Sequence, residues 1–245
     1  MNSNTELIVI LGATATGKSA LAMELAEELH TEIISADSMM VYKNFNIGTA
    51  KPTPEELAKV KHHLVDILEP EEKYSVADFQ SAASKIIADL KRQGKVPIIA
   101  GGTGLYIQAL IEGYRFNNIN DINDSGKVNK SLQSHFKDTG KLVYNAKVIG
   151  LTLDRQELYK RINERTRKMF EAGLIDEVKS LLDSGVSRSA QAMLGIGYKE
   201  TLEYIDGKIT LEDTINKISQ ATRNFAKRQF TWYKRMKYID WQFAN

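Results

Sequence analysis

The stretch LIVILGATATGKSALAMEL, residues 7–25, decides the fold of this chain. Its first five residues are apolar and predict a buried β-strand over residues 7–11, while residues 18–29 predict a helix. Between them, residues 12–19 read GATATGKS and match the pattern G-x-x-x-x-G-K-[ST]. Because this pattern lies between a strand and a helix, as a phosphate-binding loop requires, it predicts a P-loop.

Each residue type in the loop has a chemical reason. Glycines let backbone amides turn toward an anion, and the following helix adds its positive end. Lys18 adds a full charge, and Ser19 can ligate Mg²⁺, the cofactor that we expect. The predicted phosphate site consists of Gly12, Ala13, Thr14, Ala15, Thr16, Gly17, Lys18 and Ser19, with Ser19 as the metal ligand. The loop indicates a bound di- or triphosphate but leaves the reaction open, because kinases, ATPases and diphosphate-releasing enzymes share it.

Strand and helix patterns alternate beyond the loop, as is typical of a parallel α/β sheet. Further strands are predicted at residues 32–36, 63–67, 96–100 and 146–153, and further helices at residues 75–93, 103–111, 155–172, 175–184 and 210–236. We therefore expect an α/β fold with a P-loop NTPase-like parallel sheet flanked by helices and a mostly helical C-terminal part. Residues 1–115 plus 141–245 are expected to form this core, and the polar residues 116–140 an insertion.

Asp37 directly follows the strand predicted at residues 32–36. It is therefore expected at the carboxyl edge of the sheet, on the side of the P-loop. A carboxylate in that position can accept a proton, which makes Asp37 the candidate general base. Magnesium ligation through water and capping of a helix are alternative roles. Asp66, at the end of the strand predicted at residues 63–67, is a weaker candidate for the base.

The composition excludes several classes of protein. The chain has no cysteine, so disulfide frameworks and thiolate metal sites are excluded, and a reducing compartment is expected. No apolar stretch approaches the roughly 18 residues that a membrane span needs, and the N-terminus lacks a basic leader region. We therefore expect a soluble, cytoplasmic protein without a membrane partner, acting as a monomer.

Positive charge is concentrated near the C-terminus, although the net charge of the chain is only +2. Residues 223–239 contain Lys and Arg interleaved with aromatic residues and no acid. This pattern predicts a helix that faces a polyanion. The alternative is an amphipathic helix whose aromatic side chains belong to the core and whose cations are merely solvated.

Taken together, the motifs resemble the tRNA dimethylallyltransferases, which prenylate the exocyclic amine of the adenosine 3′ of the anticodon. The matching segments run in order along the chain: GATATGKS at 12–19, DSMMVY at 37–42, IGTAKP at 47–52, HHLVDI at 62–67, YSVADF at 74–79, GGTGLY at 101–106, RINERTRKMFEAGL at 161–174, GIGYKE at 195–200 and TRNFAKRQFTW at 222–232. Many collinear motifs are far more specific than the P-loop alone.

The resemblance implies roles for individual residues. Residues 14–19 would hold the diphosphate of dimethylallyl diphosphate, Asp37 would accept the amine proton, and Arg165 would reach the donor phosphates. The implied catalytic residues are Asp37, Lys18, Arg165 and Thr103, and the implied tRNA contacts are Asp37, Ser38, Met39, Met40, Thr103, Lys199, Lys227, Arg228 and Gln229. By spacing, Arg161 and Lys168 share a helix face with Arg165, for which a surface salt bridge is the alternative role.

One segment departs from the family pattern. The family usually carries a helical insertion after GGTGLY that grips the anticodon stem, and here only the short polar segment 116–139 occupies that interval. This difference concerns how tRNA is held rather than the chemistry.

Three other functions remain open from the sequence. A small-molecule kinase would use the same loop with ATP. An enzyme that prenylates free adenine nucleotides would keep the donor site without needing the basic C-terminal helix. A nucleotide-regulated RNA-binding protein would keep that helix without needing Asp37.

Overall fold

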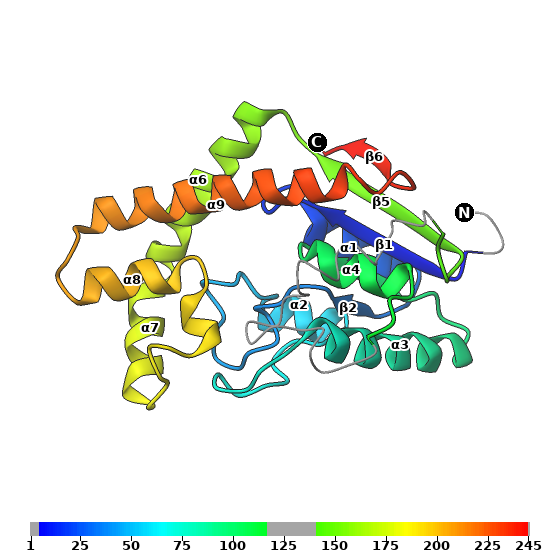
Figure 1. Cartoon of the computed structure of the whole chain (residues 1–245), viewed down its shortest axis with the longest axis horizontal. Coiled ribbons are helices and arrows are strands. Elements are labelled where there is room, and N and C mark those ends of the chain that lie inside the picture. Colours follow the sequence, from blue (N-terminus) through cyan, green and yellow to red (C-terminus); the bar gives the residue numbers. More distant parts are fainter. Residues whose placement is uncertain (1–4, 117–140, 245) are drawn as a thin grey trace.

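The computed structural model describes residues 5–116 and 141–244. Its centre is one sheet of parallel strands in the order β3-β2-β4-β1-β5-β6. The strands are β1 (Leu7–Gly12), β2 (Ile33–Ser35), β3 (His62–His63), β4 (Ile98–Gly101), β5 (Ala146–Thr152) and β6 (Asp240–Phe243). Helices flank the sheet (Figure 1), so the predicted α/β fold with a parallel sheet is confirmed.

Strand β1 is buried along its whole length because both faces of the sheet are covered. Leu7, Val9 and Leu11 face the larger core, which includes apolar residues of α3 (Val76–Arg92) and α4 (Gly104–Ile111). Ile8 and Ile10 face the other side, where they pack with α1 (Lys18–Glu28). The continuous apolar run that predicted the strand is therefore explained by two-sided burial.

Parallel strands bring three loops to one edge of the sheet. Leu11 of β1 lies beside Gly101 of β4, and Ser35 of β2 lies beside Ala100. The P-loop after β1, the segment after β2 and the turn after β4 consequently meet at the carboxyl edge, as ligand-binding segments do in open α/β sheets.

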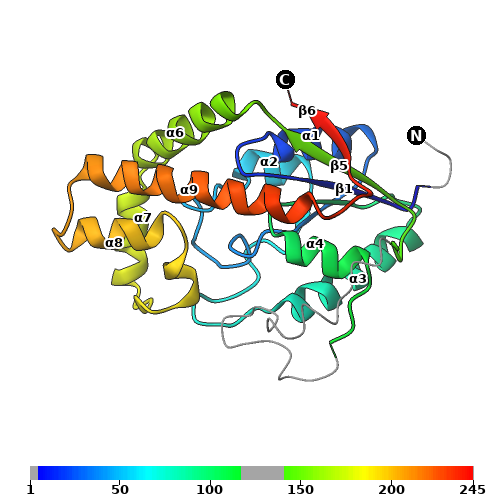
Figure 2. The same ribbon diagram turned by 45° about the horizontal axis from the view of Figure 1, so that its top comes forward.

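The C-terminal part is mostly helical, as predicted. It contains α6 (Arg155–Glu171), α7 (Leu174–Asp183), the 3₁₀ turn Gln191–Leu194, α8 (Tyr198–Ile205) and α9 (Leu211–Tyr233). Figures 1 and 2 show these helices at one end of the sheet, with the long α9 running back alongside it. Helix α9 packs on α6 and α8, and its final residues reach the core beside α4.

Several elements were not predicted: α2 (Pro54–Lys59), α8 and β6. The strand predicted at residues 63–67 is also wrong, because β3 ends at His63. Leu64 and Asp66 have φ of 61° and 54°, in the left-handed region that a strand cannot accommodate. The chain instead turns there and follows residues 40–42, with the amide of Asp66 donating to Met40 O.

The insertion predicted at 116–140 lies, except for Phe116, outside the described residues. Within the described ranges, no helix is long and apolar enough to cross a membrane.

Candidate active site

The P-loop follows the carboxyl end of β1 and contributes Thr14, Lys18 and Ser19 to the lining of a pocket. A Cβ atom on Gly12 would lie 2.5 Å from Leu151 O and 3.1 Å from Thr16 Oγ1, so only glycine fits this position. Gly17 has φ of 92° and caps α1, whose first residues are Lys18 and Ser19. The two glycines of the motif thus have separate tasks, one steric and one conformational.

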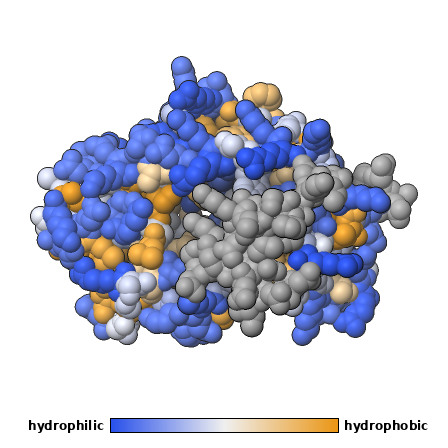
Figure 3. All heavy atoms as spheres, viewed as in Figure 1, coloured by the Kyte–Doolittle hydropathy of each residue, from blue (hydrophilic) through white to orange (hydrophobic). Residues whose placement is uncertain are grey.

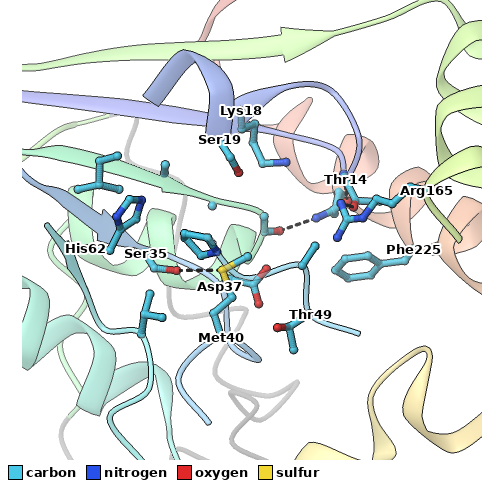
Figure 4. Close-up of a pocket in the computed structure, with 18 residues that line it drawn as sticks. Thr14, Lys18, Ser19, Ser35, Asp37, Met40, Thr49, His62, Arg165 and Phe225 are labelled. Atoms are coloured by element: carbon cyan, nitrogen blue, oxygen red, sulfur yellow. Dashed lines mark hydrogen bonds between the residues drawn. The ribbon is translucent and has the colours of Figure 1, made fainter. Parts of the chain in front are cut away.

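Two cations meet above this loop. Lys18 Nζ donates to Ala13 O at 2.7 Å, and Arg165 Nη1, from α6, donates to Thr14 Oγ1 at 3.0 Å. Figure 4 shows Lys18 and Arg165 extending into the same pocket from different elements. Burial, together with repulsion from Arg165, lowers the pKa of Lys18 to about 8, against an opposing effect of Asp37. Two half-buried cations that form no ion pair with a carboxylate of the described residues make a site suited to a polyanion.

The depressed pKa of Lys18 predicts how anion binding depends on pH. Inorganic pyrophosphate stabilises the protonated amine, so its affinity should be constant below about pH 8 and fall by about tenfold for each pH unit above it. Calorimetric titration between pH 6.5 and 9.5 measures this dependence. A Lys18→Arg variant keeps its charge throughout and is the control, because the pH dependence of its affinity reflects the ionisation of pyrophosphate alone. An unchanged wild-type affinity at pH 9.5 would remove Lys18 from the anion site.

Asp37 lines the same pocket and is the second residue after the end of β2. Its Oδ1 accepts a hydrogen bond from Met39 N at 2.8 Å, which fixes the carboxylate, while Oδ2 has no hydrogen-bond partner among the described residues. Thr103, at the start of α4, accepts a hydrogen bond from Ser38 N at 3.1 Å. The turn 37–39 is therefore fixed by Thr103, which follows β4, and Oδ2 of Asp37 is available to a ligand.

Gln229 of α9 connects the two halves of the site. Its Oε1 accepts from Thr14 N of the P-loop at 2.9 Å, and its Nε2 donates to Gly102 O at 2.8 Å. The side chain is buried, and a Cβ atom on Gly102 would lie 2.5 Å from it. Gln229 thus ties the C-terminal helix to both the P-loop and the turn after β4.

The other predicted tRNA contacts lie in two places. Met40 lines the pocket, and Met39 packs against Gly195 in the turn before α8. The predicted cations Lys199, Lys227 and Arg228 are exposed on the surface of the helical part, away from the pocket lining.

Ser38, Met39 and Thr103 are beside the pocket without being part of its lining, and three further residues considered from the sequence also lie outside it. Asp66 forms an ion pair with Lys51. Arg161 pairs with Glu157 one turn earlier on α6, at 2.8 Å, and Lys168 is exposed. Three cations were expected on one face of α6. Of these, Arg165 alone lines the pocket, where it bonds Thr14 of the P-loop.

Sequence reasoning assigned no role to one wall of the pocket. The residues involved are Thr49, Ala50, Pro52, His62, Val65 and Phe225. Most belong to the motifs at 47–52 and 62–67, so the signal was present, but apart from Asp66 no residue in these motifs was assigned a chemical role. Within residues 5–116 and 141–244, no cluster of three His, Cys, Asp or Glu side chains could hold a metal ion.

Comparison with known proteins identifies relatives of this chain. The sequence profile of the IPP transferase family matches residues 40–143 and 121–236. The tRNA dimethylallyltransferase of Carboxydothermus hydrogenoformans is 42% identical over 285 residues, covering 96% of this chain and 91% of the relative. That of Streptococcus mutans is 43% identical over 265 residues, covering 94% and 90%. Both alignments are longer than the chain, so these relatives contain residues without a counterpart here.

Solved structures agree with the sequence relatives. The full-length tRNA isopentenylpyrophosphate transferase of Bacillus halodurans superposes with a TM-score of 0.84 at 37% identity, covering 97% of this chain and 89% of that one. A eukaryotic dimethylallyltransferase acting on tRNA gives a TM-score of 0.80 at 25% identity, covering 99% and 74%. The profile, the sequence relatives and the shared fold agree, and the chain belongs to the tRNA dimethylallyltransferase family.

Proposed function

We propose that this protein transfers a dimethylallyl group from dimethylallyl diphosphate to the exocyclic amine of the adenosine 3′ of the anticodon in tRNA, releasing diphosphate. The observation that supports this most directly is the pairing of Lys18 and Arg165 at a P-loop, opposite the available carboxylate of Asp37. The names of the relatives supply the donor and acceptor classes.

The donor side of the pocket stabilises a leaving group. The adenine amine is a weak nucleophile, so the reaction depends on charge developing on the departing diphosphate. Lys18, Arg165 and the loop amides would meet that charge, and one well-placed donor of this kind contributes roughly 3–4 kcal/mol to the transition state. Repulsion between the two cations in the free protein is relieved when diphosphate binds between them.

The residues present fit a magnesium ion held mainly by the substrate. Ser19 lines the pocket beside Lys18, and Mg²⁺ usually keeps several waters and binds through few protein oxygens plus substrate phosphates. Ser19 would be the protein ligand. When bound, the ion would add positive charge to the departing diphosphate.

The acceptor side of the pocket provides the base. The target adenosine must leave its stack to enter, at a cost of a few kcal/mol that is smallest for a loop nucleotide. Asp37 would then take the amine proton as the carbon–nitrogen bond forms, with Ser38, Met39, Met40 and Thr103 around the base. We further propose that the protein works as a cytoplasmic monomer.

One experiment separates this function from the alternatives. The protein is incubated with labelled dimethylallyl diphosphate and Mg²⁺, together with tRNA, AMP or ATP plus candidate kinase substrates. Transfer of label to tRNA alone is expected. Label on AMP would favour a nucleotide prenyltransferase, and consumption of ATP without the prenyl donor would favour a kinase.

The exposed cations of α9 are proposed to hold the tRNA backbone. Hydrophilic side chains cover the surface over this helix (Figure 3), and Lys227 and Arg228 are both exposed there. Each phosphate contact releases counterions and contributes about 0.7–0.9 to the slope of log affinity against log salt. Replacing both residues by Ala should therefore flatten that slope by about 1.4–1.8 units.

Filter binding of tRNA between 50 and 300 mM salt measures the slope, with pyrophosphate affinity as the control for an intact donor site. Exposed Lys208, before α9, and Lys217, near the start of α9, differ from Lys227 and Arg228 in that each pairs with an acid. Their double Ala variant controls for the loss of two charges. A Lys227/Arg228 variant with the wild-type slope would show that RNA is held by other residues.

A further inference from the structure

The loop that carries IGTAKP forms the wall of the pocket opposite the P-loop. Thr49 lines the pocket on the same side as Met40 and Asp37, whereas Lys18 and Ser19 line the other side (Figure 4). Ala50 and Pro52 of the same loop also line the pocket. No regular element contains residues 44–52. Its shape therefore depends on individual hydrogen bonds, both within the loop and to other parts of the chain.

The loop is held in a conformation that it would not adopt alone. Asn44 and Ala50 have φ of 65° and 51°, and residues with a Cβ atom rarely occupy this left-handed region. Gly48 lies so close to Tyr198 that a Cβ atom would be 2.5 Å from its ring. A loop with two such residues needs specific contacts to persist.

One carboxylate supplies those contacts. Glu177, in the first turn of α7, accepts three successive amides of the loop: Asn46 N at 3.0 Å and Ile47 N at 2.8 Å on Oε2, and Gly48 N at 3.3 Å on Oε1. Oε1 also accepts the hydroxyl of the buried Tyr198 at 2.7 Å. Hydrogen bonds to a charged acceptor are among the stronger ones in proteins.

These contacts join parts of the chain that are about 130 residues apart in sequence. Thr49 directly follows the three residues bonded to Glu177, and its hydroxyl donates to Phe45 O. The positions of Thr49 and Ala50 are therefore fixed by Glu177 together with hydrogen bonds inside the loop. The P-loop makes its contacts with α6 and α9 instead, through Arg165 and Gln229.

We propose that Glu177 is a positioning residue for the acceptor side of the pocket: it fixes the loop 46–50 against which the target nucleotide is seated, without touching the donor. This assignment rests on the proposed function for the identity of the acceptor.

The test compares Glu177→Ala with Asp176→Ala. Asp176 is the other acid in the first turn of α7, so this control removes the same charge at the same helix end without touching the loop. Glu177→Ala should lower kcat/KM for tRNA by about 10²-fold, the scale expected when a binding wall is displaced by about 1 Å. The Kd for pyrophosphate should change less than twofold. Glu177→Gln keeps one acceptor oxygen and should lose only about tenfold.

Amide hydrogen exchange gives a readout independent of activity. The amides of Asn46, Ile47 and Gly48 should lose protection in Glu177→Ala and keep it in Asp176→Ala. Unchanged protection, or an equal loss of donor and acceptor affinity, would overturn the proposal. If the wild-type protein fails to prenylate tRNA, the proposed function fails, and protection of these amides alone decides whether Glu177 fixes the loop.

Discussion

Replacing Asp37 by Asn is expected to lower the rate of prenyl transfer by about 10²–10⁴, the usual contribution of a general base. The substitution is well suited to this position because asparagine keeps an oxygen that can accept the hydrogen bond from Met39 N. The turn should therefore keep its shape while the proton acceptor is lost. Single-turnover rates with labelled donor and tRNA measure the effect separately from product release.

Affinities distinguish a lost base from a damaged site. Asp37 raises the pKa of both Lys18 and Arg165, so the variant should be compared with wild type at pH 7, where Lys18 stays protonated in the wild type. Pyrophosphate and tRNA should then bind nearly as before. Asp176→Asn, which removes an exposed carboxylate of α7 outside the pocket lining, is the control and should keep full turnover. Normal turnover in the Asp37 variant would assign that residue a structural role.

The sequence predicts the P-loop well because its information is local. The P-loop is contiguous, and its glycines, lysine and strand context identify it without any tertiary contact. Asp37 could be placed because a parallel sheet brings the ends of its strands to one edge. The same reasoning failed for Asp66, which was expected at the end of a strand. Residues with left-handed φ end β3 after two residues, and the hydrophobic pattern of the sequence does not predict them.

The long-range contacts of the pocket were less predictable because they join distant residues. Gln229 reaches Thr14 across 215 positions, and Glu177 reaches Gly48 across 129. In the sequence both are polar residues within helical patterns, where the default expectation is a solvated face. A single chain contains no signal that distinguishes a buried bridging glutamine from an exposed one, so the sequence indicated Gln229 through the family motif alone.

Removal of Lys18 should have an effect almost as large as removal of the base. Lys18→Ala is expected to lower turnover by about 10²–10³, as for the loss of one preorganised charge-stabilising donor. Its affinity for pyrophosphate should fall by about 10–100-fold, because a hydrogen bond to a charged group contributes roughly 1.5–3 kcal/mol. Activity assays and calorimetry measure the two effects.

Stability measurements separate this loss from misfolding. The lowered pKa of Lys18 means that its charged form is less favourable in the free folded protein than in the unfolded chain. This penalty applies below about pH 8 and disappears as the pH approaches the ordinary lysine value. At pH 7 the ligand-free Lys18→Ala variant should therefore melt no lower than wild type, while the stabilisation by pyrophosphate should largely vanish. A variant that keeps the wild-type ligand-induced shift in Tm would contradict the assignment.

The pair of cations can be tested as a unit. Arg165→Ala should resemble Lys18→Ala, since Arg165 reaches the same loop through Thr14 and enters the same pocket. Groups that act on one leaving group are strongly non-additive, so the double variant should lose far less turnover than the product of the two single losses. Fully multiplicative losses would mean that the two side chains act independently, and Arg165 would then be assigned to another part of the substrate.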